Sequence, residues 1–148
     1  MTKAERAAGL FSGGFNCAQA VFGAFSDELG LDRATALKLS SGFGGGVRAG
    51  ELCGAVSGGV MAIGLLCGFH TEKDLQQKGY CYQKTREFVE KFKEANGSLN
   101  CRELLRSDVR CPDGRDAPGA QAARKPVCPC LVTCAVRLLE RMEFTREE

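Results

Sequence analysis

The stretch from 42 to 68 constrains the fold of this 148-residue chain more than any other feature. It starts as a glycine-rich segment, includes Cys53, and carries no charged residue from Leu52 to Phe69. Each glycine inside a helix costs about 1 kcal/mol relative to alanine. A helix this rich in small residues forms only if neighbouring helices pack closely against it. We therefore predict a glycine loop that leads into a buried central helix.

The glycines around the start of this helix are candidate contacts for a bound cofactor. Glycine permits positive φ and leaves peptide N–H groups unshielded. A cysteine in the first turn of a helix lies near unpaired N–H groups and the positive end of the helix dipole, which favours its thiolate. We therefore expect a stabilised thiolate at Cys53, and we assign the backbones of four glycines to cofactor binding: Gly44, Gly45, Gly46 and Gly54.

Three other interpretations of this stretch were weighed. The order Gly44-x-Gly46-x-x-Ala49 fits a loose dinucleotide-binding fingerprint, but that motif follows a strand, and residues 36–41 read as helix. The uncharged run reaches the shortest membrane-span length, but it is only weakly hydrophobic, so we expect no membrane insertion. A structural core helix with an inert cysteine stays open as an alternative.

The rest of the chain has the composition of helices and no alternating strand pattern. We expect an all-α fold, with residues 1–148 forming a single-domain helical bundle around the glycine-rich helix. Its small-residue face could also pack against a second copy, which would give a homodimer. The expected helices span 3–11, 17–29, 33 to the glycine loop, 54 to about 68, 71–96, a short helix capped by Ser98 or Asn100, and 129–142, with a loop at 107–126 that contains one turn at 121–124.

Nine cysteines are more than a chain of this length needs for stability, because 148 residues bury a sizeable core without disulfides. Their number is odd, and the N-terminal residues lack the basic-then-apolar layout of a secretory signal. We therefore expect a cytoplasmic protein. In a reducing compartment, a high cysteine content indicates metal binding or redox chemistry more often than structural bridges.

Four of the cysteines share one predicted property, since each begins a helix: Cys17, Cys53, Cys101 and Cys128. If the four helix starts converge, their thiolates meet a region rich in N–H donors, which suits a thiolate-ligated metal centre. We take these four as candidate metal ligands and, if no metal binds, as catalytic redox thiols. No local C-x-x-C pair supports the assignment. The other five are interpreted as core or incidental residues: Cys67, Cys81, Cys111, Cys130 and Cys134.

The charge balance points to no charged partner. The net charge is only +2. Arg102, Arg106 and Arg110 recur every four residues and could form a stripe on one helix, but no aromatic residues are interleaved with them. We therefore expect no nucleic-acid partner.

Five sequence blocks carry the four cysteines and the glycine loop: Asn16-Cys17-Ala18-Gln19-Ala20-Val21, Gly42-Phe43-Gly44-Gly45-Gly46, Cys53-Gly54-Ala55-Val56-Ser57-Gly58, Asn100-Cys101-Arg102-Glu103-Leu104-Leu105 and Val127-Cys128-Pro129. Together they resemble the C_GCAxxG_C_C family of redox-active proteins. The resemblance spans nearly the whole chain. It implies that the family's marked cysteines correspond to the four at the helix starts, and that the other five are additions. A similar domain occurs in a multi-haem cytochrome context with an iron–sulfur centre, which implies electron transfer but no particular substrate.

Three functional hypotheses follow for the four cysteines. The first is an iron–sulfur cluster that passes electrons to a redox partner protein whose identity the sequence does not give. The second is a thiol/disulfide oxidoreductase or redox sensor, for which four cysteines allow three pairings. The third is a structural zinc module, because zinc favours four thiolate ligands in a tetrahedron.

Overall fold

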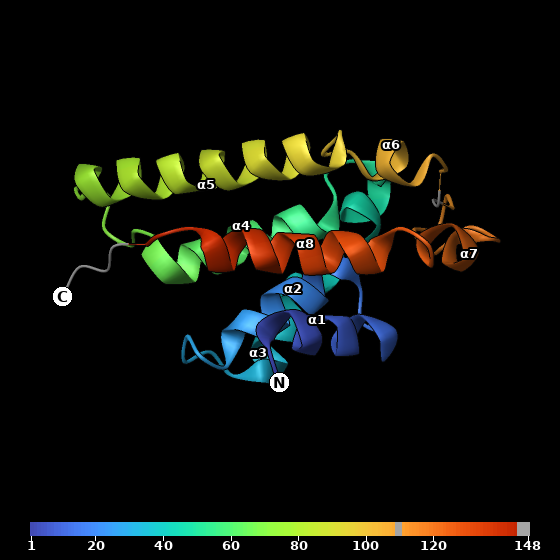
Figure 1. Ribbon diagram of the computed structural model, residues 1–148, viewed down its shortest axis with the longest axis horizontal. Coiled ribbons are helices and arrows are strands. Elements are labelled where there is room, and N and C mark those ends of the chain that lie inside the picture. Colours follow the sequence, from blue (N-terminus) through green and yellow to red (C-terminus); the bar gives the residue numbers. More distant parts are fainter. Residues whose placement is uncertain (109–110, 145–148) are drawn as a thin grey trace.

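The computed structural model describes residues 1–108 and 111–144 and has the predicted all-α fold, with eight α-helices and no strand in the described residues (Figure 1). A 3₁₀ turn at Ser41–Phe43 and a turn at Gly46–Gly50 form the glycine loop. The α-helices are α1 (Lys3–Ser12), α2 (Cys17–Ser26), α3 (Arg33–Ser40), α4 (Gly54–Cys67), α5 (Leu75–Asn96), α6 (Cys101–Leu105), α7 (Ala120–Arg124) and α8 (Cys128–Arg141).

Side-chain caps explain where most of the helices begin. Asn16 caps α2 and forms a reciprocal capping box with Gln19, in which each side chain accepts a hydrogen bond from the other residue's backbone N–H. Asp74 caps α5, and Gly97 ends that helix with a φ of 88°. Asn100 caps α6. The caps Asn16 and Asn100 were predicted, whereas α5 was predicted to start at Thr71 and starts four residues later, because Asp74 rather than Thr71 is its cap.

Boundaries of α2 and α8 also differ from the prediction. α2 ends at Ser26 rather than near Leu29, because the N–H groups of Leu29 and Leu31 both donate to the Ser26 carbonyl and turn the chain. α8 begins at Cys128, with Val127 as its cap, so the helix starts one residue earlier than predicted from Pro129. Proline is still in the first turn, where its missing N–H costs nothing.

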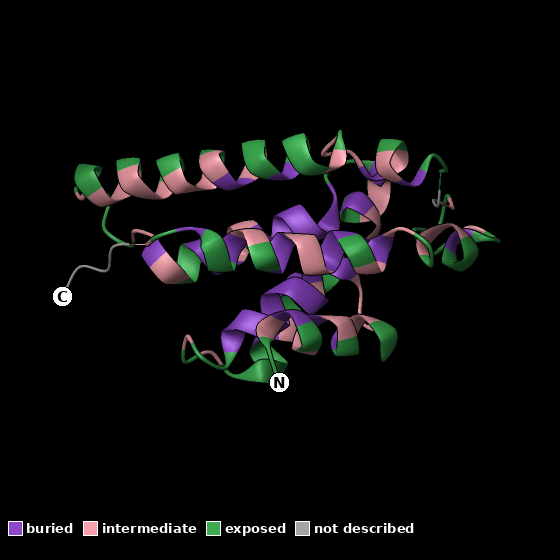
Figure 2. Ribbon diagram, in the orientation of Figure 1, coloured by how far each residue is buried: buried purple, intermediate pink, exposed green. Residues whose placement is uncertain are grey.

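The centre of the bundle is the pair α2 and α4. α2 contacts α1, α3, α4 and α8, and α4 contacts α2, α5 and α8. Figure 1 shows α1 and α3 on the side of α2 that faces away from α5. Figure 2 shows that the buried residues concentrate on the middle helices, while the outer face of α5 is exposed. One contiguous hydrophobic core connects these helices.

Small residues of α4 allow this close packing. A Cβ added at Gly58 would lie 2.6 Å from the carbonyl oxygen of Ala18 in α2, and one added at Gly59 would overlap the ring of Phe88 in α5. The small-residue face is therefore covered within the chain at these two positions, and homodimer formation stays a prediction. No described helix is long and apolar enough to span a membrane.

The arginine stripe expected after Cys101 does not form on one helix. α6 ends at Leu105, and Arg106 adopts a left-handed conformation with a φ of 54°. Arg110 lies outside the described residues, which omit positions 109 and 110 of the predicted 107–126 loop. Within that loop, α7 occupies the predicted helical turn, starting one residue earlier.

Candidate functional site

The four candidate cysteines each lie at the start of a helix, as predicted. Cys17, Cys101 and Cys128 are the first residues of α2, α6 and α8, and Cys53 is the N-cap of α4. All four are buried. Together they line one small cavity of about 10 Å³. Four helices that are separate in sequence therefore present their first thiols to the same interior point.

Backbone pairing brings Cys53 and Cys101 to this cavity. Leu52 and Asn100 form an isolated antiparallel bridge. Next to it, the N–H of Cys53 donates to the Leu99 carbonyl at 2.8 Å, and the N–H of Cys101 donates to the Glu51 carbonyl at 2.6 Å. These bonds tie the start of α4 to the start of α6, so the residues on either side of the bridge become neighbours.

The start of α4 packs closely against the start of α2, and this contact places Cys17 at the cavity. Gly54 lies so near α2 that an added Cβ would be 3.2 Å from the Cys17 Cβ and 3.1 Å from the Ala18 nitrogen. The Cys17 side chain in turn hydrogen-bonds that of Cys128 in α8. The glycine at the first position of α4 is therefore a geometric requirement of the cavity.

The predicted cofactor-binding glycines occupy three different environments. Gly45 and Gly54 line the four-cysteine cavity. Gly46 lies beside it, where an added Cβ would be 2.8 Å from the Cβ of Cys101. Gly44 instead packs against the side chain of Asn16. The loop continues in left-handed conformation through Val47 and Arg48, with φ values of 63° and 56°.

Burial keeps most of these thiols protonated in the absence of a bound group. It raises the pKa of Cys53 to about 12, although the nearby backbone N–H groups of Ala55 and Val56 oppose this rise. It also raises the pKa of Cys101, with the charge of Cys128 as the next cause. The expectation of a stabilised thiolate at Cys53 is therefore wrong for the thiol alone, because desolvation outweighs the helix start.

Cys17 and Cys128 behave as a coupled pair. The hydrogen bond that Cys17 donates to Cys128 raises the pKa of Cys17 well above its ordinary value, and burial adds to the rise. The same bond lowers the pKa of Cys128, against the effect of burial, and the positive charge of Arg124 lowers it further. Cys128 is thus the thiol of the four that the surroundings favour as a thiolate.

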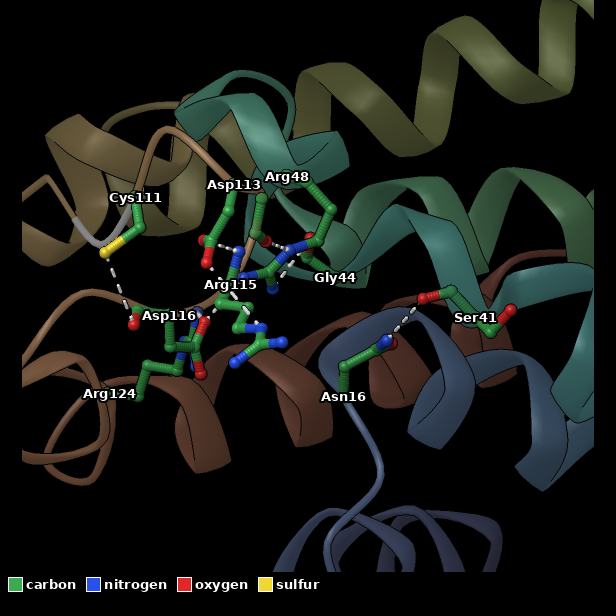
Figure 3. Close-up of polar contacts among 10 residues, drawn as sticks. Asn16, Ser41, Gly44, Arg48, Cys111, Asp113, Arg115, Asp116 and Arg124 are labelled. Carbon is green, nitrogen blue, oxygen red and sulfur yellow. Dashed lines mark hydrogen bonds and ion pairs between the residues drawn. The ribbon is translucent and has the colours of Figure 1, made fainter.

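An Arg–Asp–Arg cluster lies beside the cavity (Figure 3). Arg124, at the end of α7, binds both carboxylate oxygens of Asp116 at 2.5 and 2.7 Å. Arg48 of the glycine loop binds the same carboxylate at 2.6 Å and donates through Nε to the Gly114 carbonyl at 3.0 Å. Hydrogen bonds from Arg124 and then Arg48 hold the pKa of Asp116 well below its usual range.

The remaining cysteines do not line the four-cysteine cavity. Cys67 is buried and hydrogen-bonds Cys81, which is half-buried in α5. Cys134 accepts a hydrogen bond from Asn96, Cys111 contacts the Asp116 carbonyl at 3.6 Å, and Cys130 is exposed.

The four-cysteine cavity has the donor set of a metal or cluster site but not the volume of one. The donor set fits a thiolate-ligated centre, because four cysteines and several N–H groups meet there. The space does not yet fit it, since about 10 Å³ holds about one water molecule. Within residues 1–108 and 111–144, no three Cys, His, Asp or Glu side chains have the arrangement of a metal site.

Fold and site together define an all-α protein with four convergent, buried cysteines. The sequence model of the family described as "Putative redox-active protein (C_GCAxxG_C_C)" matches residues 15–142. The chain belongs to this family of redox-active proteins, as its sequence blocks indicated. Comparison with curated proteins gave no match, and comparison with solved structures gave none either.

Proposed function

We propose that Cys17, Cys53, Cys101 and Cys128 bind an iron–sulfur cluster and that the protein passes electrons to a partner protein. The observation that carries this proposal is that four thiols, far apart in sequence, line the same cavity at four helix starts. Thiolates are the usual ligands of such clusters, which supply one-electron transfer when bound. Membership of a redox-active family agrees with this role.

The chain's own residues would stabilise the negative charge of the thiolates. The N–H groups of Ala55 and Val56, in the first turn of α4, favour the thiolate of Cys53. The positive charge of Arg124 lowers the pKa of Cys128 and so favours its thiolate. Hydrogen bonds and charges of this kind also set the reduction potential of a metal centre. Because the cavity is small, we expect loading to require local movement of the cysteine side chains.

Anaerobic reconstitution with iron and sulfide tests the proposal. The reconstituted protein should show visible absorption from a cluster, a paramagnetic signal in one oxidation state, and a fixed iron content. Cys53→Ser should lose most of the bound iron, whereas Cys130→Ser, a matched change of an exposed cysteine outside the cavity, should retain it. A colourless wild type, or full loading of the Cys53 variant, contradicts the proposal. Stoichiometric zinc in protein purified without oxygen would favour the structural zinc module instead.

A thiol/disulfide function is the second candidate, because Cys17 and Cys128 already hydrogen-bond each other. The Cys128 thiolate would attack a sulfur of a small disulfide, forming a mixed disulfide and releasing one thiol. Cys17, after losing its proton, would attack the Cys128 sulfur and release the second thiol. The protein loses two electrons and two protons, and the small disulfide gains them.

Differential alkylation in glutathione redox buffers distinguishes this candidate. Mass spectrometry should find a Cys17–Cys128 disulfide whose fraction rises with the proportion of oxidised glutathione. Cys17→Ser should abolish it, and Cys130→Ser should leave it unchanged. Thiols that are equally alkylated in reducing and oxidising buffers would exclude the thiol/disulfide function.

A further inference from the structure

A second and much larger cavity lies next to the four cysteines. Its volume is about 550 Å³, within the range of about 300–1,000 Å³ typical of small-molecule sites. It shares Cys17, Gly45 and Arg124 with the four-cysteine cavity, so the two are in direct contact. We call it the outer pocket. It lies between the end of α1, the glycine loop and α7.

The charges that line the outer pocket are mainly positive. Arg48, Arg124 and Lys125 contribute three cations, and Asp116 contributes the one carboxylate among the lining residues. The net charge of the wall is therefore +2. Asp116 fixes both guanidinium groups through three hydrogen bonds of 2.5–2.7 Å. Arginines that are already oriented lose less conformational entropy when they bind a ligand.

Part of the lining is apolar. Phe11 and Phe15, both half-buried, line the pocket together with the amide residues Asn16 and Gln121. Aromatic rings provide contact area for an apolar group at a small entropic cost. A pocket lined by both cations and two aromatic rings suits a ligand that is negatively charged at one end and apolar at the other.

We propose that the outer pocket binds a small organic anion, a phosphate monoester or a carboxylate attached to an apolar group, against Arg48, Arg124 and Lys125. Guanidinium and ammonium groups bind the oxygens of carboxylate and phosphate through charge-assisted hydrogen bonds, and each guanidinium has more N–H donors than Asp116 uses. The apolar part of the ligand lies on Phe11 and Phe15. Since the proposal uses neither a metal nor a thiol, it holds whether or not the four cysteines bind a cluster.

Calorimetric titration of the reduced, metal-free full chain tests the proposal with three probes of similar size. Phenyl phosphate and benzoate carry the two candidate anionic groups, and benzyl alcohol is the neutral control. At least one anion should bind saturably at a single site. The anion that binds with the higher affinity identifies the preferred anionic group. Benzyl alcohol should bind at least tenfold more weakly. Failure of both anions to saturate would overturn the proposal.

Variants locate the binding. Lys125→Gln should weaken binding of the anion by about fivefold, the effect expected for one exposed charge. Lys73→Gln is the matched control, because the α4–α5 connection lies at the opposite end of the molecule from α7 (Figure 1). Arg48→Gln, with its fold checked by circular dichroism, should weaken binding of the anion at least as much as Lys125→Gln does. Equal weakening by Lys73→Gln would indicate unspecific charge attraction and refute the assignment.

Discussion

Replacing Gly58 with alanine measures how tightly α2 and α4 are packed. The added Cβ would lie 2.6 Å from the Ala18 carbonyl oxygen and 3.1 Å from the Ala18 Cα. Ordinary contacts of a Cβ begin near 3.4 Å, and every atom it meets here is backbone. No side chain can rotate away, so the two helices must separate by most of an ångström. Ala18 follows Cys17 directly, and the movement therefore reaches the four-cysteine cavity.

Two opposing effects set the magnitude. Alanine is favoured over glycine in a helix by about 1 kcal/mol. Forcing an extra carbon into a packed interior costs about 1–3 kcal/mol. Because the clash is with backbone, we expect the upper part of that range and a net loss of about 1–2 kcal/mol. For a chain of this size, that corresponds to a Tm lower by roughly 2–8 °C.

Gly64→Ala is the matched control, since Gly64 lies in the same helix with nothing within 4 Å of an added Cβ. It should raise Tm by roughly 2–4 °C, because only the helix preference of alanine acts. Thermal unfolding followed by circular dichroism measures both variants. The reasoning is refuted if the two substitutions shift Tm in the same direction, or if Gly58→Ala leaves it unchanged.

Three further predictions address the cap of α2, the aspartate cluster and a buried thiol. Asn16→Ala should lower Tm by roughly 2–4 °C, since a side-chain cap contributes about 1 kcal/mol. Ser12→Ala, which removes an exposed hydroxyl at the end of α1, should change Tm by less than half as much. Because the pKa of Asp116 is lowered in the folded chain, its contribution to stability is complete above the ordinary value of 3.8 and is lost as pH falls through the lowered value. Acid denaturation should therefore destabilise the wild type more than Asp116→Asn below that ordinary value, and parallel curves would contradict this. Burial raises the pKa of Cys67 to about 11, so at pH 8 about one molecule in a thousand carries its thiolate, and timed alkylation with mass spectrometry should label exposed Cys130 far sooner.

Local sequence signals predicted most of the helices because the helix starts depend on residues close in the chain. Asn16, Asp74 and Asn100 cap helices through bonds to N–H groups three residues on. The end of α2 was missed because it depends on a turn around the Ser26 carbonyl that no residue type marks. The position of the four cysteines at helix starts could also be predicted, because nearby residues in the sequence mark where a helix begins.

The surroundings of the cysteines could not be predicted, because they depend on contacts between distant segments. Arg48, Asp116 and Arg124 are separated by 68 and 8 residues, and no spacing rule links them. The burial of the four cysteines could not be predicted from the sequence either. A helix start favours a thiolate, but the sequence does not show that Cys53 is shielded from water, and burial reversed the expected direction of its pKa.

The conflict between burial and charge constrains any function of the four-cysteine cavity. Placing four thiolates together without a counter-charge is unfavourable, as the raised pKa values of Cys17, Cys53 and Cys101 indicate. Ionisation beyond Cys128 therefore requires a positive group in the cavity, or oxidation that removes the thiols as a pair. A bound metal, as a cluster or as zinc, and a disulfide all meet this requirement, and they differ in whether a metal ion or a second sulfur replaces the protons. Iron that binds the thiolates should release protons into solution. Oxidised glutathione instead takes up the protons that the thiols lose, so it should release none and proton release would separate the two routes.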